Sequence, residues 1–304
     1  MEEIGEKTPK ISIIILSYQK YDGLYRTLDT ILSQNYRNIE ILISDDGSEQ
    51  FPESEIMIWA KKHAKIKIQI RRNRANLGTV AHANLAASYC TGEYIKFLPP
   101  GDGFCSSNAL EKLVREAKKK NALILTSPSL VYFKDYENIR FEFPSKHRIK
   151  KLKIFTSEQL FSAISQSNFI SAVGTIFHRK FFDEGGFDEE YRYLDDWPTW
   201  LSWLRQGRQI EVLEVPTVYY GLEGISNQAG NAFHSKLLHT DLLHCYKKEI
   251  LPYKERLSPF IRWFVNYRYG KLKGDRSFAF WIGHFPAELY CVLKQRIKDL
   301  LMRG

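Results

Sequence analysis

The first part of the chain alternates apolar runs with amphipathic segments. Residues 11–16 and 39–43 are β-branched and almost continuously apolar, which is typical of strands buried on both faces of a parallel sheet. Between them, the apolar positions of residues 24–32 recur every three to four residues, and Asp22 is a suitable cap for that helix. A strand, a helix and a second strand with short joins predict a right-handed βαβ unit.

The same alternation continues toward the middle of the chain. Further strands are expected at 66–70, 94–98, 122–126 and 173–177, and helices at 78–89, 107–120 and 200–205. Because parallel strands need such crossovers, these elements predict an α/β fold with a mostly parallel sheet flanked by helices.

The alternation weakens in the second half of the chain. Residues 130–143 predict a hairpin, and Thr156 with Gln159 forms the capping-box pattern that opens a helix. From residue 232 onward the pattern is almost entirely helical. The sequence therefore predicts an α/β domain in residues 1–228 and a helical C-terminal extension in residues 229–304.

Composition and charge narrow the class of protein. The 304 residues are 44% hydrophobic and 26% charged, which is typical of a soluble globular chain. The net charge of +9 favours an anionic partner, and nucleic acid, acidic lipid and phosphorylated ligands all satisfy it. The four cysteines form no C-x-x-C pair, and no signal peptide precedes the first apolar run, so we expect a cytoplasmic protein without disulfides or zinc. The longest apolar stretch, 278–293, contains His284, Pro286 and Glu288, which argues against a membrane span.

Candidate chemistry gathers where the predicted strands end. In an open parallel sheet, ligands bind outside the carboxyl ends of the strands, and this rule selects Ser17-Tyr18, Asp45-Asp46, 71–76 and 99–103. Each segment also has a simpler explanation, because Asp and Gly are common in turns and the arginines after residue 70 suit a solvated loop. All four fall at the same edge of one predicted sheet, which favours a binding site.

Three separated segments resemble family 2 glycosyltransferases. They read ISIIILSYQKYDGLYRTLDTILSQNYRNIEILISDDGS, NLGTVAHANLAASYCTGEYIKFLPPGD and GTIFHRKFFDEGGFDEEYRYLDDWPTWL, and the likeness runs from about residue 10 to about residue 226. It implies a GT-A fold, inversion at the anomeric carbon, and a nucleotide-sugar donor, usually a UDP-sugar, bound with Mn²⁺ or Mg²⁺. Carried over position by position, it implies a nucleotide-sugar-binding set of Ser17, Tyr18, Asp46 (or Asp45), Asn76 and Asn84.

The sequence departs from this family after the fourth strand. Where the family has an acidic cluster, this chain has Pro99, Pro100 and Gly101, and only Asp102 remains as the expected metal ligand. One carboxylate with diphosphate oxygens and waters can still hold a hard cation. A basic side chain such as Arg71 is expected to share the neutralisation of the leaving diphosphate.

The resemblance also implies a catalytic base. Asp195-Asp196-Trp197 matches the family's acidic pair at the start of a helix, with Asp196 as the base, Asp195 beside it and Trp197 facing the acceptor sugar. The alternative for the acidic pair is a helix cap. Trp200 and Trp203 follow at helical spacing and are expected in the core.

The C-terminal segment 258–304 mixes aromatic and basic residues. Such a mixture suits a helix that lies on the inner membrane surface, and it suits equally a helical pair that packs on the catalytic domain or on a second subunit of a homo-oligomer. The aromatic and basic residues concerned are Phe260, Trp263, Phe264, Tyr267, Tyr269, Phe278, Phe280, Trp281, Phe285, Tyr290, Arg262, Arg268, Lys271, Lys273, Arg276, Lys294, Arg296, Lys298 and Arg303.

Together these features predict an inverting enzyme of bacterial surface-polysaccharide synthesis. It would transfer a hexose or N-acetylhexosamine to an oligosaccharide acceptor that is free or lipid-linked. The alternative is a catalytically lapsed module of the same fold that still binds the sugar nucleotide, because the acidic cluster is incomplete. A nucleic-acid partner is not expected, since the sequence contains no nucleic-acid-binding motif.

Overall fold

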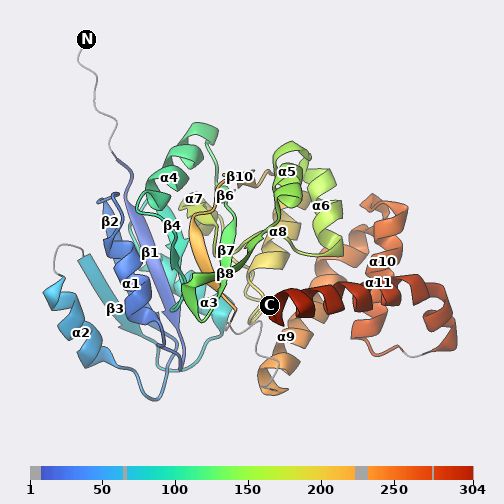
Figure 1. The fold of residues 1–304 in the computed structure, drawn as a ribbon, viewed down its shortest axis with the longest axis horizontal. Coiled ribbons are helices and arrows are strands. Elements are labelled where there is room, and N and C mark those ends of the chain that lie inside the picture. Colours follow the sequence, from blue (N-terminus) through green and yellow to red (C-terminus); the bar gives the residue numbers. More distant parts are fainter. Residues whose placement is uncertain (1–7, 64–66, 223–231, 276, 304) are drawn as a thin grey trace, which may run out of the picture.

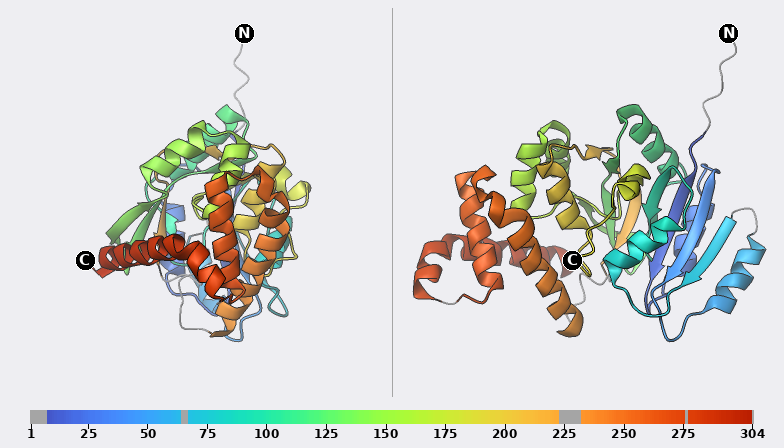
Figure 2. Two further views of the ribbon diagram at one scale, coloured as in Figure 1. Left: turned by 90° about the vertical axis from the view of Figure 1, so that its right-hand side faces the viewer. Right: turned by 180° about the vertical axis from the view of Figure 1, so that it is seen from behind.

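Two sheets and their covering helices form the N-terminal part of the molecule, and a helical arm follows (Figures 1 and 2). The computed structural model describes residues 8–63, 67–222, 232–275 and 277–303. The main sheet pairs its strands in the order β10 (Glu211–Val212), β6 (Ile124–Thr126), β9 (Ile176–His178), β4 (Tyr94–Phe97), β1 (Ile11–Ser17), β2 (Ile39–Asp45), β3 (Lys67–Arg72). Only β9 among these described strands runs antiparallel to its neighbours, so the predicted mostly parallel sheet is confirmed.

A smaller sheet packs beside the carboxyl end of β4. Its strands are β5 (Gly103–Phe104), β11 (Val218–Gly221), β7 (Ser129–Phe133) and β8 (Asp135–Phe143). β7 and β8 pair antiparallel, which confirms the predicted hairpin.

Helices cover both faces of the main sheet because its strands are apolar on both sides. Ile11, Ile13 and Ile15 of β1 pack toward α1 (Leu24–Leu32) and α4 (Ala109–Lys120), while Ile14 packs toward α3 (Thr79–Ser88). Successive side chains of a strand point to opposite faces, so a continuous apolar run serves both layers. The remaining helices of this part are α2 (Glu53–Lys62), α5 (Lys146–Ile154), α6 (Ser157–Gln166), α7 (Lys180–Asp183) and α8 (Asp196–Arg205).

Local start signals are partly as predicted. Thr156 and Gln159 form the expected capping box at α6. The prediction that Asp22 caps α1 is wrong. Helix α1 begins at Leu24, and its cap position is held by Gly23, which has a φ of 80° that glycine adopts readily. Helices α2 and α5 were not predicted, because each is short and only weakly amphipathic.

The C-terminal part is helical, as predicted. It comprises α9 (Ala232–Cys245), the π-helical turn η2 (Tyr246–Ile250), the 3₁₀ turn η3 (Leu251–Arg256), α10 (Pro259–Leu272) and α11 (Phe278–Arg303). α10 packs on α6 and α11 packs on α10, so the arm extends the molecule on one side (Figure 1). The boundary predicted between residues 228 and 229 falls outside the described residues and stays a prediction. Arg276 also lies outside them, as do the side chains of Phe278, Trp281, Lys294, Lys298 and Arg303.

Within the part of the chain that the structure describes, no helix is both long enough and apolar enough to cross a membrane.

Candidate functional site

The carboxyl ends of β1, β2 and β3 bring three polar residues into one row. The register pairs Ser17 with Asp45 and Asp45 with Arg72. Asp45 is fully buried, and its carboxylate accepts hydrogen bonds from the hydroxyl of Tyr21 at 2.6 Å and the backbone N–H of Ser48 at 2.9 Å. The Arg72 Nε lies 3.6 Å from Asp45 Oδ2. Asp45 therefore fixes the turn that follows β2.

Asp46 organises the next loop along the same edge. Its Oδ1 accepts from Asn73 Nδ2 at 2.9 Å and from the Leu77 N–H at 3.0 Å, and its Oδ2 accepts from the Gly78 N–H at 3.0 Å. The side chain is 2% exposed. Both carboxylate oxygens thus hold the β3–α3 loop in place, and a contact between Asp46 and a nucleotide stays a prediction.

Ser17 and Tyr18 line the end of β1. The buried Ser17 donates its Oγ hydrogen to the Ser44 carbonyl at 3.3 Å, and the partly exposed Tyr18 accepts from Gln19 Nε2 at 3.2 Å. Tyr18 is the more accessible of the two. Their role in donor binding stays a prediction.

Asn76 joins the β3–α3 loop to the segment that precedes α8. The Nη2 of Arg192 donates to Asn76 Oδ1 at 2.7 Å and to the Asn76 carbonyl at 3.1 Å. The Val80 N–H donates to the Arg192 carbonyl at 3.2 Å. Gly78 allows this approach, because a Cβ there would lie 2.6 Å from Arg192 Cγ. The β3–α3 loop and the 192–194 segment are therefore held together.

Asp102 is buried at the end of β4 beside a buried lysine. Its Oδ1 accepts from the Gly221 N–H at 2.8 Å, and burial raises its pKa to about 7. Burial likewise lowers the pKa of Lys96 to about 7, although the charge of Asp102 opposes that shift. The Lys96 ammonium donates to the carbonyls of Phe97 and Val173. Asp102 is thus removed from water, and the charges of Lys96 and Arg26 both act on it.

The proline-glycine loop before Asp102 is clamped by the small sheet. The hydroxyls of Tyr132 and Tyr136 both donate to the Gly101 carbonyl, at 2.6 Å and 3.0 Å. The Arg26 guanidinium lies over the Tyr136 ring at 4.7 Å and donates to the Tyr132 hydroxyl at 3.0 Å. Aromatic and cationic groups therefore occupy the place where the resembled family has carboxylates.

The side chains near Asp102 decide how the expected divalent cation could be bound. Among the described residues, no group of three or more His, Cys, Asp or Glu side chains could hold an ion. Asp102 offers Oδ2 in addition to the oxygen that accepts from Gly221. Of the residues that the structure describes, Asp102 would therefore be the one protein ligand of a divalent cation. Diphosphate oxygens and water would supply the other ligands.

Asp195 and Asp196 stand at the start of α8. Asp196 Oδ2 accepts from Asn168 Nδ2 at 2.8 Å and its Oδ1 from the Trp197 N–H at 2.6 Å. Asp195 occupies the cap position of α8 but makes no side-chain capping bond, so the simple capping role considered for it is not fulfilled. Removal from water, and then the neighbouring Asp196 charge, raises the pKa of Asp195 to about 7. Removal from water also raises the pKa of Asp196.

Three predicted side chains are used elsewhere in the structure. Trp197 is 7% exposed and donates its indole N–H to the Ile164 carbonyl, and its expected contact with an acceptor stays a prediction. Asn84 binds both the carbonyl and the N–H of Phe187 and fixes that turn, so it has little left for a nucleotide. Arg71 lies 5.1 Å over the Tyr89 ring, on the face opposite Arg72, which is the arginine that contacts the β2 turn.

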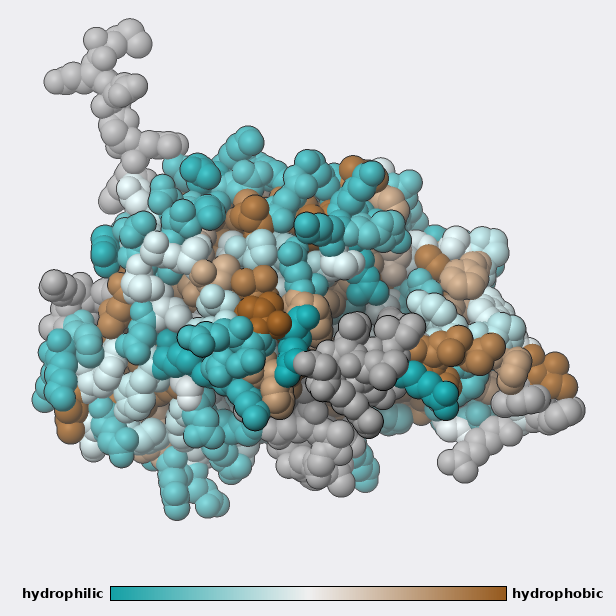
Figure 3. Space-filling model, in the orientation of Figure 1, coloured by the Kyte–Doolittle hydropathy of each residue, from teal (hydrophilic) through white to brown (hydrophobic). Residues whose placement is uncertain are grey.

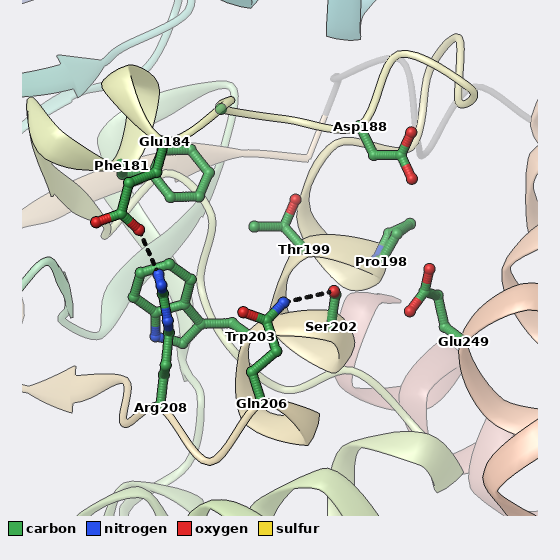
Figure 4. A pocket seen from close by; sticks show the side chains of 11 residues that line it. Phe181, Glu184, Asp188, Pro198, Thr199, Ser202, Trp203, Gln206, Arg208 and Glu249 are labelled. Carbon is green, nitrogen blue, oxygen red and sulfur yellow. Dashed lines mark hydrogen bonds and ion pairs between the residues drawn. The ribbon is translucent and has the colours of Figure 1, made fainter.

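A pocket of about 370 Å³ lies along one side of α8 (Figure 4). The view shows Thr199 and Ser202 of α8, and Gln206 directly after it, facing the pocket. Glu249 and Asp188 border it and form ion pairs with Arg205 and Lys248. None of the predicted site residues lines this pocket. The predicted tryptophan core is confirmed, since Trp200 is fully buried and Trp203 is 7% exposed.

The geometry agrees with the comparison to known families. The sequence signature of "Glycosyl transferase family 2" matches residues 12–186, more than half of the chain. The chain belongs to glycosyl transferase family 2. The matched region ends before Asp195 and Asp196.

Relatives and solved structures support the same assignment. The chain is 26% identical over 239 residues to "UDP-Glc:alpha-D-GlcNAc-diphosphoundecaprenol beta-1,3-glucosyltransferase WfaP" of Escherichia coli, covering 77% of this chain and 85% of WfaP. It spans about three fifths of the length of several other curated relatives.

Two solved glycosyltransferases share the fold. Staphylococcus aureus TarS 1–349 in complex with UDP-GlcNAc superposes with a TM-score of 0.57 at 16% identity, over 88% of this chain and 73% of TarS. The mannosyltransferase PcManGT of Pyrobaculum calidifontis, in complex with GDP-Man and Mn²⁺, gives 0.60 at 14% identity, over 97% of this chain and 83% of PcManGT. The GT-A fold expected from the sequence is therefore confirmed.

Sequence reasoning missed Lys96, Arg192 and Asp241. Lys96 lies in an apolar run that predicts an ordinary buried strand, and its charge is the feature that distinguishes it from its neighbours. Arg192 and Asp241 lie in a loop and a helix that have no motif, and the chain folds them together across 48 intervening residues. No local sequence pattern predicts such a contact.

Proposed function

We propose that this family 2 protein is an inverting glycosyltransferase that moves a hexose or N-acetylhexosamine from a UDP-sugar to a lipid-linked glycan. The acidic pair at the start of α8 carries the proposal. Both carboxyl groups have raised pKa values, and Asp195 makes no side-chain capping bond. A carboxylate of this kind is a suitable general base near neutral pH.

Asp196 is assigned the base. It takes the proton from an acceptor hydroxyl while that oxygen forms a bond to the anomeric carbon of the donor sugar. The bond from that carbon to the diphosphate oxygen breaks on the opposite face, and UDP leaves with the electron pair. Asn168 donates to one oxygen of Asp196, which fixes the direction of its other lone pairs.

The donor is assigned to the edge formed by β1, β2 and the β3–α3 loop. Ser17, Tyr18 and the 73–78 loop held by Asp46 would contact the nucleotide. A divalent cation held by Asp102 and the diphosphate would neutralise the leaving group when bound. In WfaP the printed donor is UDP-Glc and the printed acceptor is GlcNAc-diphosphoundecaprenol, which makes this pair the first to test. A lipid-linked acceptor would place the protein at the inner face of the cytoplasmic membrane.

Release of UDP from UDP-glucose, with a GlcNAc-diphospholipid as acceptor, tests the assignment. We expect turnover in the native protein and a loss of about a thousandfold in Asp196→Asn, within the usual range for removal of a general base. Glu184→Gln changes an exposed carboxylate that pairs with Arg208 beside the α8 pocket, and it should keep full activity.

The lapsed module predicts a different outcome. It would bind UDP in a thermal-shift assay, yet release none from any of a panel of nucleotide sugars, and Asp196→Asn would then change nothing. Repeating the thermal shift with Mn²⁺ on native protein and Asp102→Asn tests the cation separately. We expect Mn²⁺ to strengthen UDP binding only where Asp102 is present.

A further inference from the structure

The segment that leads into the acidic pair has no helix or strand of its own. Residues 184–194 connect α7 to α8, and their position decides where Asp195 and Asp196 stand. Asn84 of α3 anchors the start of the segment through both backbone groups of Phe187. Something else must anchor its end, because backbone N–H groups that face the interior need acceptors.

That anchor comes from the C-terminal part of the chain. The Oδ2 of Asp241, on α9, accepts from three consecutive backbone N–H groups: Arg192 at 3.0 Å, Tyr193 at 2.6 Å and Leu194 at 3.1 Å. Asp241 is 6% exposed. A carboxylate accepting three N–H groups from one stretch of backbone fixes that stretch in position and direction, since charge-assisted bonds are the strong ones.

Neighbouring contacts extend the same clamp. Lys248 of η2 pairs with Asp188 at 2.5 Å and with Glu190 at 2.9 Å, and His244 of α9 lies 3.1 Å from Glu190. On its other side, the segment contacts the β3–α3 loop through the hydrogen bond from Arg192 to Asn76. Arg192 therefore connects the loop proposed to bind the donor with the segment that precedes the proposed base. Asp241 fixes the backbone of that segment at Arg192.

We propose that Asp241 is a positioning residue for the transferase reaction. It acts through the 192–194 backbone, keeping Asp195 and Asp196 at the distance from the donor that the in-line attack needs, and it touches neither substrate. The inference rests on the proposed function, and it makes the helical extension a working part of the site. It also explains why an acidic residue is buried on α9, where no catalytic motif stands.

Two variants of Asp241 separate geometry from mere stability. Asp241→Ala removes the acceptor, and Asp241→Asn keeps one oxygen without the charge. With UDP-glucose and a GlcNAc-diphospholipid, we expect kcat to fall about a hundredfold in Asp241→Ala, because small misplacements of reacting groups cost rates of that order. Asp241→Asn should recover part of this loss. KM for UDP-glucose and the thermal shift by UDP should stay within twofold.

A matched control is Glu40, a buried carboxylate at the opposite edge of the sheet. It accepts from the Thr91 N–H at 2.6 Å and from Lys10 and Ser12, far from the acidic pair in sequence and fold. Glu40→Gln should lower the melting temperature and leave kcat unchanged. A common stability effect would instead lower both quantities in both variants.

Hydrogen exchange supplies a readout that does not depend on activity. The N–H groups of residues 192–194 should exchange faster in Asp241→Asn than in the native protein, while those of β1 and β2 stay protected. Unchanged exchange at 192–194, or a native kcat in Asp241→Ala, would overturn the proposal. If Asp196→Asn kept full activity, the base assignment itself would fail, which is a distinct result.

Discussion

At the scale of single residues, a neighbouring charge and a hydrogen-bond donor shift the pKa values of the acidic pair in opposite directions. Burial raises the pKa of Asp195 most, and the neighbouring Asp196 charge raises it further, to about 7. Asn168 donates to Asp196 and so favours its ionised form. The two groups titrate as a coupled pair.

This balance predicts the pH dependence of the reaction. The base, Asp196, works only when ionised, and burial raises its pKa, so the acid limb of kcat should lie at a higher pH than an ordinary aspartate would give. Asp195→Asn removes the neighbouring charge and should move this acid limb to lower pH. Asn168→Ala removes the donor and should move it to higher pH. Profiles of kcat against pH for both variants check this, and a shift of the same sign in both would contradict it.

The residue scale is also where sequence reasoning reached least far. The resemblance placed Asp46, Asp102, Asp195 and Asp196 at strand or helix ends, and the structure has them at such ends. It could not tell which side chains are already engaged. Asn84, Arg71 and Trp197 bind partners that lie 18 to 103 residues away in the chain. A local pattern does not encode contacts of that kind.

At the scale of elements, prediction succeeded where periodicity is strong. The strands β1 and β2 are continuous runs of apolar residues with both faces covered, and the first βαβ unit follows from them. α2 was missed because only Ile56 on it is buried, and β9 runs antiparallel because its direction depends on the return of the chain from α6. Such long-range routing is set by packing of the whole domain.

The junction between the β3–α3 loop and the 192–194 segment offers a test at this scale. Gly78 has φ of 88°, and an added Cβ would lie 2.6 Å from Arg192 Cγ and 2.8 Å from its carbonyl oxygen. Gly78→Ala should therefore destabilise the fold by about 2 kcal/mol or more and raise KM for the donor. Urea unfolding and donor kinetics measure the two effects.

Gly207 is the matched control for this substitution. Its φ of 81° is nearly the same, but no atom lies within 4 Å of a Cβ added there. Gly207→Ala carries the backbone cost alone, about 1 kcal/mol, and should leave the donor KM unchanged. Equal losses of stability and equal KM values in the two variants would show that the contact with Arg192 does not matter.

At the scale of the whole molecule, charge and apolar surface gather in the helical arm. Residues 258–304 hold nine Lys and Arg against three Asp and Glu, so most of the net charge of +9 lies there. One face of α11 packs on α10 through Ala287 and Cys291. The opposite face exposes Ile282, Leu289 and Leu293, which are 49–56% accessible. Figure 3 shows hydrophobic surface over the helical arm.

Helix α11 is apolar on two faces, and the face that does not pack on α10 needs a partner that removes it from water. We expect an anionic membrane surface to cover this face, because it matches both the exposed apolar side chains and the basic composition of the arm. A lipid-linked acceptor would lie on the same surface, so the arm would hold the acidic pair close to its substrate. A second copy of the chain would match the apolar face but would bring two strongly basic arms together, which mutual repulsion disfavours.

Sedimentation with vesicles tests this assignment. We expect binding to vesicles that contain phosphatidylglycerol, weaker binding to pure phosphatidylcholine, and a decline as salt rises. The double variant Leu289→Glu with Leu293→Glu should lose more than tenfold in affinity, since each leucine contributes about 2 kcal/mol on burial. Ile58→Glu, at an equally exposed position of α2, should bind as the native protein does. A dimer in solution that the double variant dissociates, with no vesicle binding by the native protein, would instead assign the face to a second subunit.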